Sequence, residues 1–249
     1  MRAMSIILNR DFRELRQSNA FRIIVIVSVL IVIAAAAGIS IVLGQQEWVG
    51  EAAAAPGLEL ITGLIAYFMP LLILISFIWS FATLPITREK INGNIECLLA
   101  TPLTPRALWL GKCLAVFLPG YAVSVIAALL VLLAVNLFAI NPSAGHFILP
   151  APALLTGFII NPLLFLGLLA FMVLFAIANN PEIALAPSFI LGFGLMMGLP
   201  IGLATGAVNV ASWAFALWYL AGTAVVWAII LYLSRLLNKE NIVLSSKGV

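Results

Sequence analysis

Six long stretches of the chain consist almost entirely of hydrophobic residues, and short polar segments separate them. A helix needs roughly 20 apolar residues to cross the hydrocarbon core of a bilayer. Each stretch reaches that length, and none shows the alternation expected of a membrane β-strand. The pattern predicts an all-α membrane protein with a single transmembrane domain over residues 1–249. The six predicted transmembrane helices lie near residues 21–43, 60–84, 113–140, 153–178, 188–210 and 213–233.

The composition agrees with this interpretation. Hydrophobic residues make up 64% of the chain and charged residues only 8%, whereas a soluble domain carries roughly 25% charged residues. These values exclude a water-soluble α/β enzyme, a disordered chain and a free-standing nucleic-acid-binding module. The first apolar stretch is longer than the roughly 7–15 residues of a signal-peptide core, so we expect a retained membrane anchor.

The positions of lysine and arginine predict the orientation in the membrane. All twelve lie before the uncharged run that begins at Ile23, between the second and third stretches, or after the last. Because basic residues favour the cytoplasmic side, both termini and residues 85–112 are expected inside a plasma (inner) membrane. The tail 238–249 then lies in the cytoplasm, and segments 44–59 and 141–152 face outward. The connection 179–187 is placed inside only because the number of spans requires it.

The predicted spans carry no charged residue at their centres. Ion-coupled transporters usually keep such residues for function, so a self-powered transporter is not favoured. No catalytic or metal-ligating set is recognisable either, since the two cysteines lack metal-type spacing and His146 lies alone in an external segment. Most interior polar side chains are expected to make helix–helix hydrogen bonds. They are Thr62, Ser76, Ser80, Ser124, Asn136, Thr156, Asn161 and Thr205.

An amphipathic helix is predicted at the start of the chain, within residues 1–20. Its apolar positions follow helical spacing, with arginines on the other side. Such a helix lies along a membrane surface. It can be a simple anchor on anionic lipid or a platform for a cytoplasmic subunit, and the sequence leaves both open. The apolar stripe consists of Met4, Ile7, Leu8, Phe12 and Leu15.

A second cytoplasmic feature is the loop over residues 85–112. Asn92-Gly93 predicts a turn, and Asn94 can cap a short helix that Pro102 ends. Thr104 is expected to cap the next helix, with Pro105 at its first position. The short helix displays apolar and charged side chains together, so it either floats at the interface or docks into a groove on a partner.

The loop carries a recognisable order of residues: Arg88-Glu89-Lys90, Gly93, Ile95-Glu96, Leu98-Leu99-Ala100-Thr101-Pro102 and Gly111-Lys112. This order, together with the amphipathic first helix and six spans, resembles the ABC-2-type permease family, the membrane subunits of ATP-binding-cassette exporters. The resemblance implies that the amphipathic helix, with Met4, Ile7, Leu8, Phe12 and Leu15, is the interface helix of that family. Asn94 stands where Thr or Ser is common in that family. The chain has no complete P-loop, because Cys113 follows Gly111-Lys112, so it is not expected to bind ATP by that motif.

The resemblance implies a transporter subunit rather than an enzyme. ATP and Mg would be bound by a separate ABC ATPase subunit, this chain would bind no cofactor, and two permease copies would form a homodimer in the lipid bilayer. No nucleic acid is expected to bind. The uncharged spans favour export of a hydrophobic or amphipathic substrate. The implied ATPase-coupling residues are Arg88, Glu89, Lys90, Gly93, Ile95, Glu96, Leu98, Leu99 and Pro102.

Small residues recur every four positions in the fifth predicted span, at Gly194, Gly198, Gly202 and Gly206. Such a stripe permits close helix packing. It can pack within the chain, form the homodimer seam or line a moving conduit. Two other functions remain as alternatives: a non-transporting membrane scaffold that uses the same loop, and an intramembrane enzyme, which is less favoured because no polar catalytic cluster is recognisable.

Overall fold

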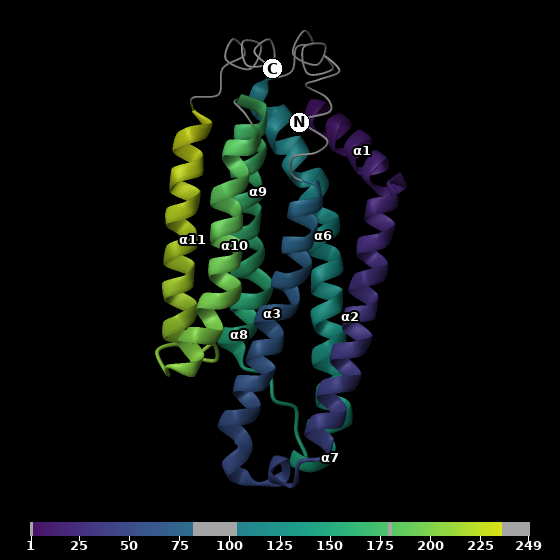
Figure 1. The fold of residues 1–249 in the computed structure, drawn as a ribbon, viewed down its shortest axis with the longest axis vertical. Helices are drawn as coiled ribbons and strands as arrows, with labels where there is room; N and C mark the ends of the chain where they lie inside the picture. Colours follow the sequence, from purple (N-terminus) through teal and green to yellow (C-terminus); the bar gives the residue numbers. More distant parts are fainter. Residues whose placement is uncertain (1, 82–103, 179–180, 236–249) are drawn as a thin grey trace.

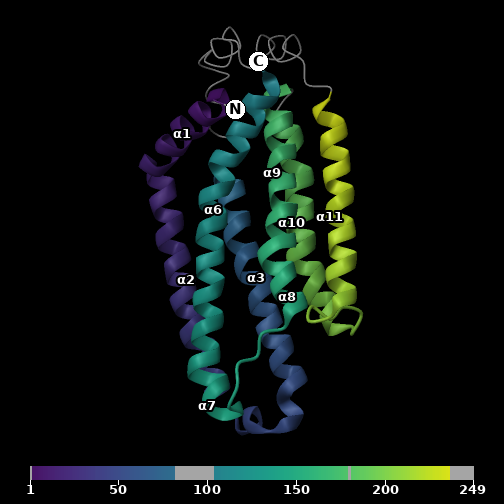
Figure 2. The same ribbon diagram turned by 180° about the vertical axis from the view of Figure 1, so that it is seen from behind.

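The computed structural model describes residues 2–81, 104–178 and 181–235, and within these ranges it contains helices and no β-strand. Long helices run side by side in a bundle, and the first helix is inclined across one end of it (Figures 1 and 2). The long helices are α1 (Arg2–Gln17), α2 (Asn19–Gly44), α3 (Ala55–Phe81), α6 (Pro105–Val135), α9 (Asn161–Ala178), α10 (Pro181–Ala204) and α11 (Trp213–Ser234).

Short elements extend or connect these helices. The 3₁₀ helices η1 (Glu47–Gly50) and η2 (Ala52–Ala54) join α2 to α3. The π-helix η3 (Asn136–Ile140) continues α6 into the short helix α7 (Asn141–Ala144). The helix α8 (Ala151–Leu155) and the π-helix η4 (Thr156–Ile160) lead without a break into α9.

Five helical segments of the described chain are long and apolar enough to cross a membrane. They are Asn19–Gly44, Ala55–Phe81, Pro105–Ala144, Ala151–Ile177 and Trp213–Ser234. Each coincides with a predicted span to within a few residues at most ends. The fifth predicted span, 188–210, overlaps α10, of which Gly192–Ala204 forms a shorter apolar helix, but its last residues are wrongly included because α10 ends at Ala204. The prediction of an all-α, multi-pass membrane protein is therefore confirmed, while six spans and the orientation stay predictions.

Of two predictions about the connections between helices, one is confirmed and the other is wrong. Thr104 caps α6 as predicted, because its Oγ1 accepts a hydrogen bond from the Ala107 N–H (3.3 Å), and Pro105 is the first helical residue. The predicted connection 179–187 is wrong, since α10 already begins at Pro181. Proline favours the first position of a helix, where its missing N–H costs nothing.

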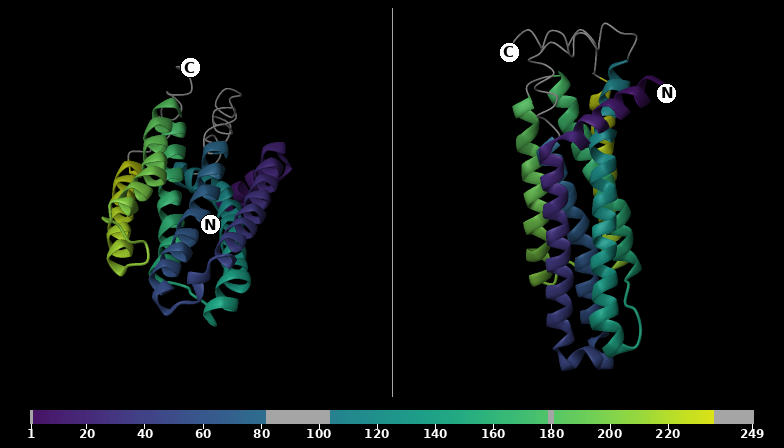
Figure 3. Two further views of the ribbon diagram at one scale, coloured as in Figure 1. Left: turned by 60° about the horizontal axis from the view of Figure 1, so that its bottom comes forward. Right: turned by 90° about the vertical axis from the view of Figure 1, so that its right-hand side faces the viewer.

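The bundle has a buried centre and exposed edges. The most apolar window of α3 is 72% buried, whereas that of α2 is 6% buried and that of α11 17%. Figure 3 shows α2 and α11 at opposite margins of the bundle. Large apolar side chains such as Ile26, Leu30 and Trp218 point outward from these two helices. Such surfaces are stable in lipid and costly in water, which fits a protein that lies in a bilayer.

Candidate functional site

The described part of the chain contains only some of the predicted site residues. The nine predicted coupling residues, from Arg88 to Pro102, lie outside the described residues. In α1, Ile7 and Leu15 are buried in the main hydrophobic cluster. Leu8 is half-buried, Phe12 is 37% exposed, and Met4 lies in the first turn. The predicted apolar stripe is therefore divided, with one part packed on the bundle and Phe12 facing outward.

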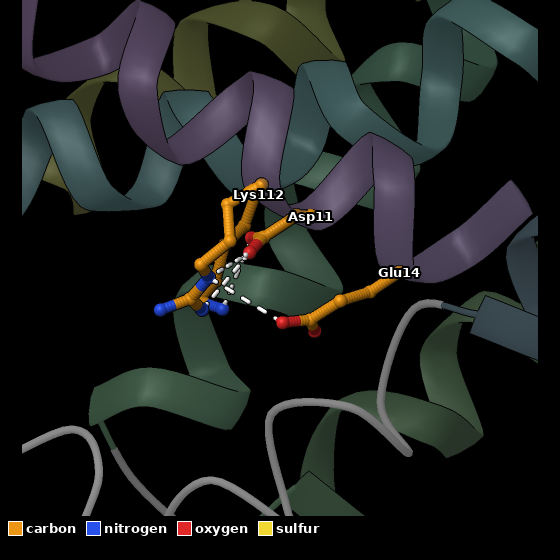
Figure 4. Close-up of polar contacts among 4 residues, drawn as sticks. Asp11, Glu14 and Lys112 are labelled. Atoms are coloured by element: carbon orange, nitrogen blue, oxygen red, sulfur yellow. Dashed lines mark hydrogen bonds and ion pairs between the residues drawn. The ribbon is translucent and has the colours of Figure 1, made fainter. Parts of the chain in front are cut away.

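An ion pair joins α1 to the beginning of α6. The Lys112 ammonium lies 3.3 Å from Asp11 Oδ2, and the two side chains are only 5% and 15% exposed. Arg10 lies 2.9 Å from the other oxygen of the same carboxylate and 3.7 Å from Glu14. Figure 4 shows the side chains of Asp11, Glu14 and Lys112 directed toward one another. We call Arg10, Asp11, Glu14 and Lys112 the α1–α6 junction.

Because this ion pair is buried, it holds α1 against α6. Breaking a buried pair leaves an uncompensated charge, which is far more costly than losing an exposed pair. Separation of α1 from α6 would also uncover Ile7 and Leu15, which lie one turn on either side of Asp11. The two helices are therefore expected to move together.

Sequence reasoning missed this junction, although it singled out both of its helices. Asp11 and Lys112 are 101 residues apart, so the sequence around one residue does not show that the other is its partner. One signal was present: Ile7, Asp11 and Leu15 recur at every fourth position and share one helical face. A carboxylate between two buried apolar side chains indicates a cationic partner on the helix it packs against.

A second group of polar contacts lies in the middle of the bundle. Asn161 Nδ2 donates to the Tyr67 carbonyl of α3 (3.1 Å), and the Tyr219 hydroxyl of α11 donates to Asn161 Oδ1 (2.6 Å). The rings of Tyr67 and Tyr219 meet edge to face, with centroids 5.9 Å apart. We call Tyr67, Asn161 and Tyr219 the tyrosine–asparagine junction. It connects α3, α9 and α11.

Proline and a π-helix explain why these contacts lie here. Pro70 has no N–H, so it cannot donate to the Ala66 carbonyl one turn earlier in α3. Gly157 of η4 packs directly against that carbonyl. A Cβ at residue 157 would overlap the Ala66 oxygen and lie 2.7 Å from its carbon. The close approach of α3 and η4 therefore requires glycine.

A second proline, in α9 directly after η4, also leaves a carbonyl without its helical donor. Pro162 cannot donate to the Phe158 carbonyl, and the Tyr121 hydroxyl of α6 donates to it instead (3.0 Å). The Asn161 N–H donates to the Thr156 carbonyl five residues earlier, as a π-helix requires. The Tyr121 side chain thus satisfies a carbonyl that Pro162 leaves without its helical donor, which an apolar environment demands.

The expectation that most interior polar side chains bond between helices is wrong for five of them. Their hydroxyls donate to carbonyls three or four residues earlier in their own helix, the usual outcome for Ser and Thr within helices. Asn161 and Asn136 do reach other segments, and Asn136 Oδ1 accepts from the Ile148 N–H (2.9 Å). The five hydroxyls are those of Thr62, Ser76, Ser124, Thr156 and Thr205.

The glycines of the fifth predicted span do not share one environment. A Cβ at Gly194 or Gly198 would meet no atom beyond its own helix backbone within 4 Å, so these two do not pack against another helix among the described residues. A Cβ at Gly202 would lie 2.7 Å from Val208, in the turn that follows α10. Gly206 has φ +72° in that turn, a conformation that favours glycine.

Within the described residues, no group of three or more His, Cys, Asp or Glu side chains could hold a metal ion. His146 lies exposed, with Nδ1 2.9 Å from the Ala144 carbonyl oxygen. The fold and its two junctions thus define a multi-pass α-helical membrane protein whose first helix is tied to α6. Comparison finds no matching family model, characterised protein or solved structure.

The tyrosine–asparagine junction gives a direct stability prediction. Asn161→Ala removes two interhelical hydrogen bonds and is expected to lower the free energy of unfolding by about 1–2 kcal/mol, since each is worth about 0.6 kcal/mol in a membrane protein and a small cavity adds to the loss. Tyr219→Phe removes one bond and should cost about 0.6 kcal/mol. Unfolding of the purified chain in detergent measures both.

Thr205→Ala is the control, because the exposed Thr205 hydroxyl, directly after α10, bonds only to the Ile201 and Gly202 carbonyls at the end of that helix. It is expected to change stability by less than about 0.5 kcal/mol. An Asn161→Ala variant as stable as Thr205→Ala would show that the junction does not hold the three helices together.

Proposed function

We propose that this chain is the transmembrane permease subunit of an ATP-driven ABC exporter. It has six transmembrane helices and cytoplasmic termini, forms a homodimer in the plasma (inner) membrane, and moves a hydrophobic or amphipathic substrate out of the cytoplasm. A separate ATPase subunit binds ATP and Mg. The order of residues in the 85–112 loop supports this function, as do the interface helix and the apolar spans.

One structural observation carries the proposal beyond the sequence pattern. Lys112, the last residue of that pattern, forms a buried ion pair with Asp11 in the helix interpreted as the interface helix. A coupling segment and an interface helix serve one task only if a movement of the first reaches the second. The α1–α6 junction supplies that connection, because the two helices are expected to move together.

The mechanism follows from this connection. ATP-driven closure of the partner displaces the coupling segment 88–101, and α6, which begins directly after it, moves together with α1. At the centre of the bundle, α6 reaches η4 through Tyr121 and α3 through Gly120, where a Cβ would lie 3.0 Å from Phe77. A displacement at one end thus reaches the helices that meet at the tyrosine–asparagine junction.

The substrate class rests on the character of the bundle. The predicted spans carry no charged residue at their centres, and a small hollow between α3, α9 and α10, about the size of one water molecule, is lined by apolar and aromatic side chains with no ionisable group. Apolar walls favour a substrate that is itself apolar or amphipathic over a free ion. The lining residues are Ile75, Ile78, Trp79, Phe165, Leu168 and Gly192.

The test is co-purification with an ATPase encoded beside this chain. Glu96→Lys, or Leu98→Ser with Leu99→Ser, is expected to abolish co-purification because docking needs both charge complementarity and apolar anchors. Glu59→Lys is the matched control, since Glu59 is an exposed carboxylate in the first turns of α3, at the opposite end of that helix from the residues that lead into the loop. It should leave the complex and membrane insertion intact.

Two outcomes would contradict the proposal. If the Glu96 and Leu98/Leu99 variants keep the ATPase bound and its hydrolysis coupled, the coupling segment is wrongly assigned. If the intact complex in vesicles hydrolyses ATP without moving any amphipathic dye or lipid, a membrane scaffold that recruits a cytoplasmic protein is the better function.

A further inference from the structure

Three arginines beside the bend between α1 and α2 are exposed and carry no ion pair within the described part of the chain: Arg13, Arg16 and Arg22. Arg10 differs, because Asp11 and Glu14 lie beside it. Asp11 and Glu14 are thus engaged with Arg10 and Lys112, and three positive charges remain open to an external partner.

The bend places the three arginines next to the start of the exposed apolar surface of α2. The Ser18 hydroxyl donates to the Leu15 carbonyl (2.7 Å) and accepts from the Phe21 N–H (3.1 Å), so one side chain ends α1 and caps α2. The two helices leave Ser18 in different directions, as Figure 3 shows. Arg22 lies in the first turn of α2, directly before the exposed residues Ile23 and Ile26.

Exposed apolar side chains accompany the arginines on α1. Ile6 is 69% exposed and lies two turns before Arg13, on the same helical face. Phe12 is exposed one turn before Arg16. The opposite face is already occupied, since Ile7 and Leu15 pack in the bundle. A free face of arginines mixed with large apolar side chains is typical of a helix lying in the interface of a bilayer.

We propose that Ile6, Phe12, Arg13, Arg16 and Arg22 form a binding surface for the headgroups of anionic phospholipids. Guanidinium groups donate paired hydrogen bonds to phosphate oxygens, and the apolar side chains enter the adjoining acyl region. Lipid fits better than an acidic protein, because Arg22 adjoins a helix whose apolar side chains are exposed along its length. The proposal does not depend on the export function.

The test is titration of the purified full chain in detergent with phosphatidylglycerol or with phosphatidylcholine, with bound lipid counted by native mass spectrometry. Each basic residue contributes about fivefold in affinity at an anionic surface. Arg13→Gln, Arg16→Gln and Arg22→Gln together should therefore weaken phosphatidylglycerol binding roughly 100-fold, and Arg13→Gln alone about fivefold. Lysine at the same three positions should retain most of the affinity, which controls for folding.

The matched control is Arg106→Gln with Arg235→Gln, two exposed arginines on α6 and at the end of α11. This variant should keep phosphatidylglycerol affinity within about fivefold of the unmodified chain. Equal losses in both variants, an unchanged affinity in the triple glutamine variant, or equal binding of the two lipids would overturn the proposal. So would a triple variant that keeps its lipid and loses a bound ATPase, because the surface would then belong to a protein partner.

Discussion

Gly157→Ala is expected to destabilise the bundle by at least about 3 kcal/mol and to lower its thermal midpoint by about 10 °C, if the chain folds at all. The added Cβ would overlap the Ala66 carbonyl oxygen, which belongs to backbone and cannot rotate away. Helix α3 must then move away from η4. That movement stretches the hydrogen bond from Asn161 to the Tyr67 carbonyl, so packing and polar contacts are lost together.

Gly198→Ala is the matched control for this prediction. It adds the same methyl group to an apolar helix, at a position where the new Cβ would meet no atom within 4 Å beyond its own helix backbone in the described part of the chain. Because alanine is the better helix former by up to about 1 kcal/mol, this variant should be as stable as the unmodified chain or slightly more stable. Size-exclusion profiles and thermal unfolding in detergent measure both. Equal midpoints for the two variants would show that η4 does not approach α3 this closely.

Asp11→Lys is expected to cost about 3–4 kcal/mol, because it places a second ammonium against the buried Lys112. Since α1 should then separate from α6, Ile7 and Leu15 would become exposed and new protease cleavage sites in α1 should appear. If the proposed function is correct, the ATPase of such a complex would still hydrolyse ATP but drive little or no export.

Reversal of both charges separates this interpretation from simple misfolding. Asp11→Lys combined with Lys112→Asp restores an opposite-charge pair and should recover at least half of the lost stability, as a double-mutant cycle measures. Glu14→Lys is the control, because the Glu14 side chain is 68% exposed and its pairing with Arg10 is worth less than about 1 kcal/mol. Failure of the double reversal to recover any stability would contradict a direct Asp11–Lys112 interaction.

The parts of the fold that depend on local sequence were predictable. Runs of about 20 apolar residues predicted α2, α3 and α11 to within a few residues at most ends, because a bilayer makes length and apolarity the main requirement. The cap at Thr104 was predictable for a similar reason, since capping depends on three or four consecutive residues. The error at 179–187 arose where Pro181 was taken for part of a loop although it begins a helix.

The candidate site was predictable only in part. The amphipathic helix and the Gly111-Lys112 pair were identified, but their connection through Asp11 was not, because a contact across 101 residues leaves no local pattern. The tyrosine–asparagine junction was missed for the same reason. Asn161 was recognised as an interior polar residue, yet its partners Tyr67 and Tyr219 lie 94 and 58 residues away.

The sequence by itself determined that this is an all-α, multi-pass membrane protein, because hydrophobic transfer and backbone hydrogen bonding act on each segment separately. It also determined the helical, amphipathic nature of the first segment. Only the tertiary structure decided that Asp11 pairs with Lys112, that Gly157 meets the Ala66 carbonyl freed by Pro70, and which face of α1 stays open. These depend on which helices become neighbours, and packing geometry selects neighbours from many segments of nearly equal apolarity.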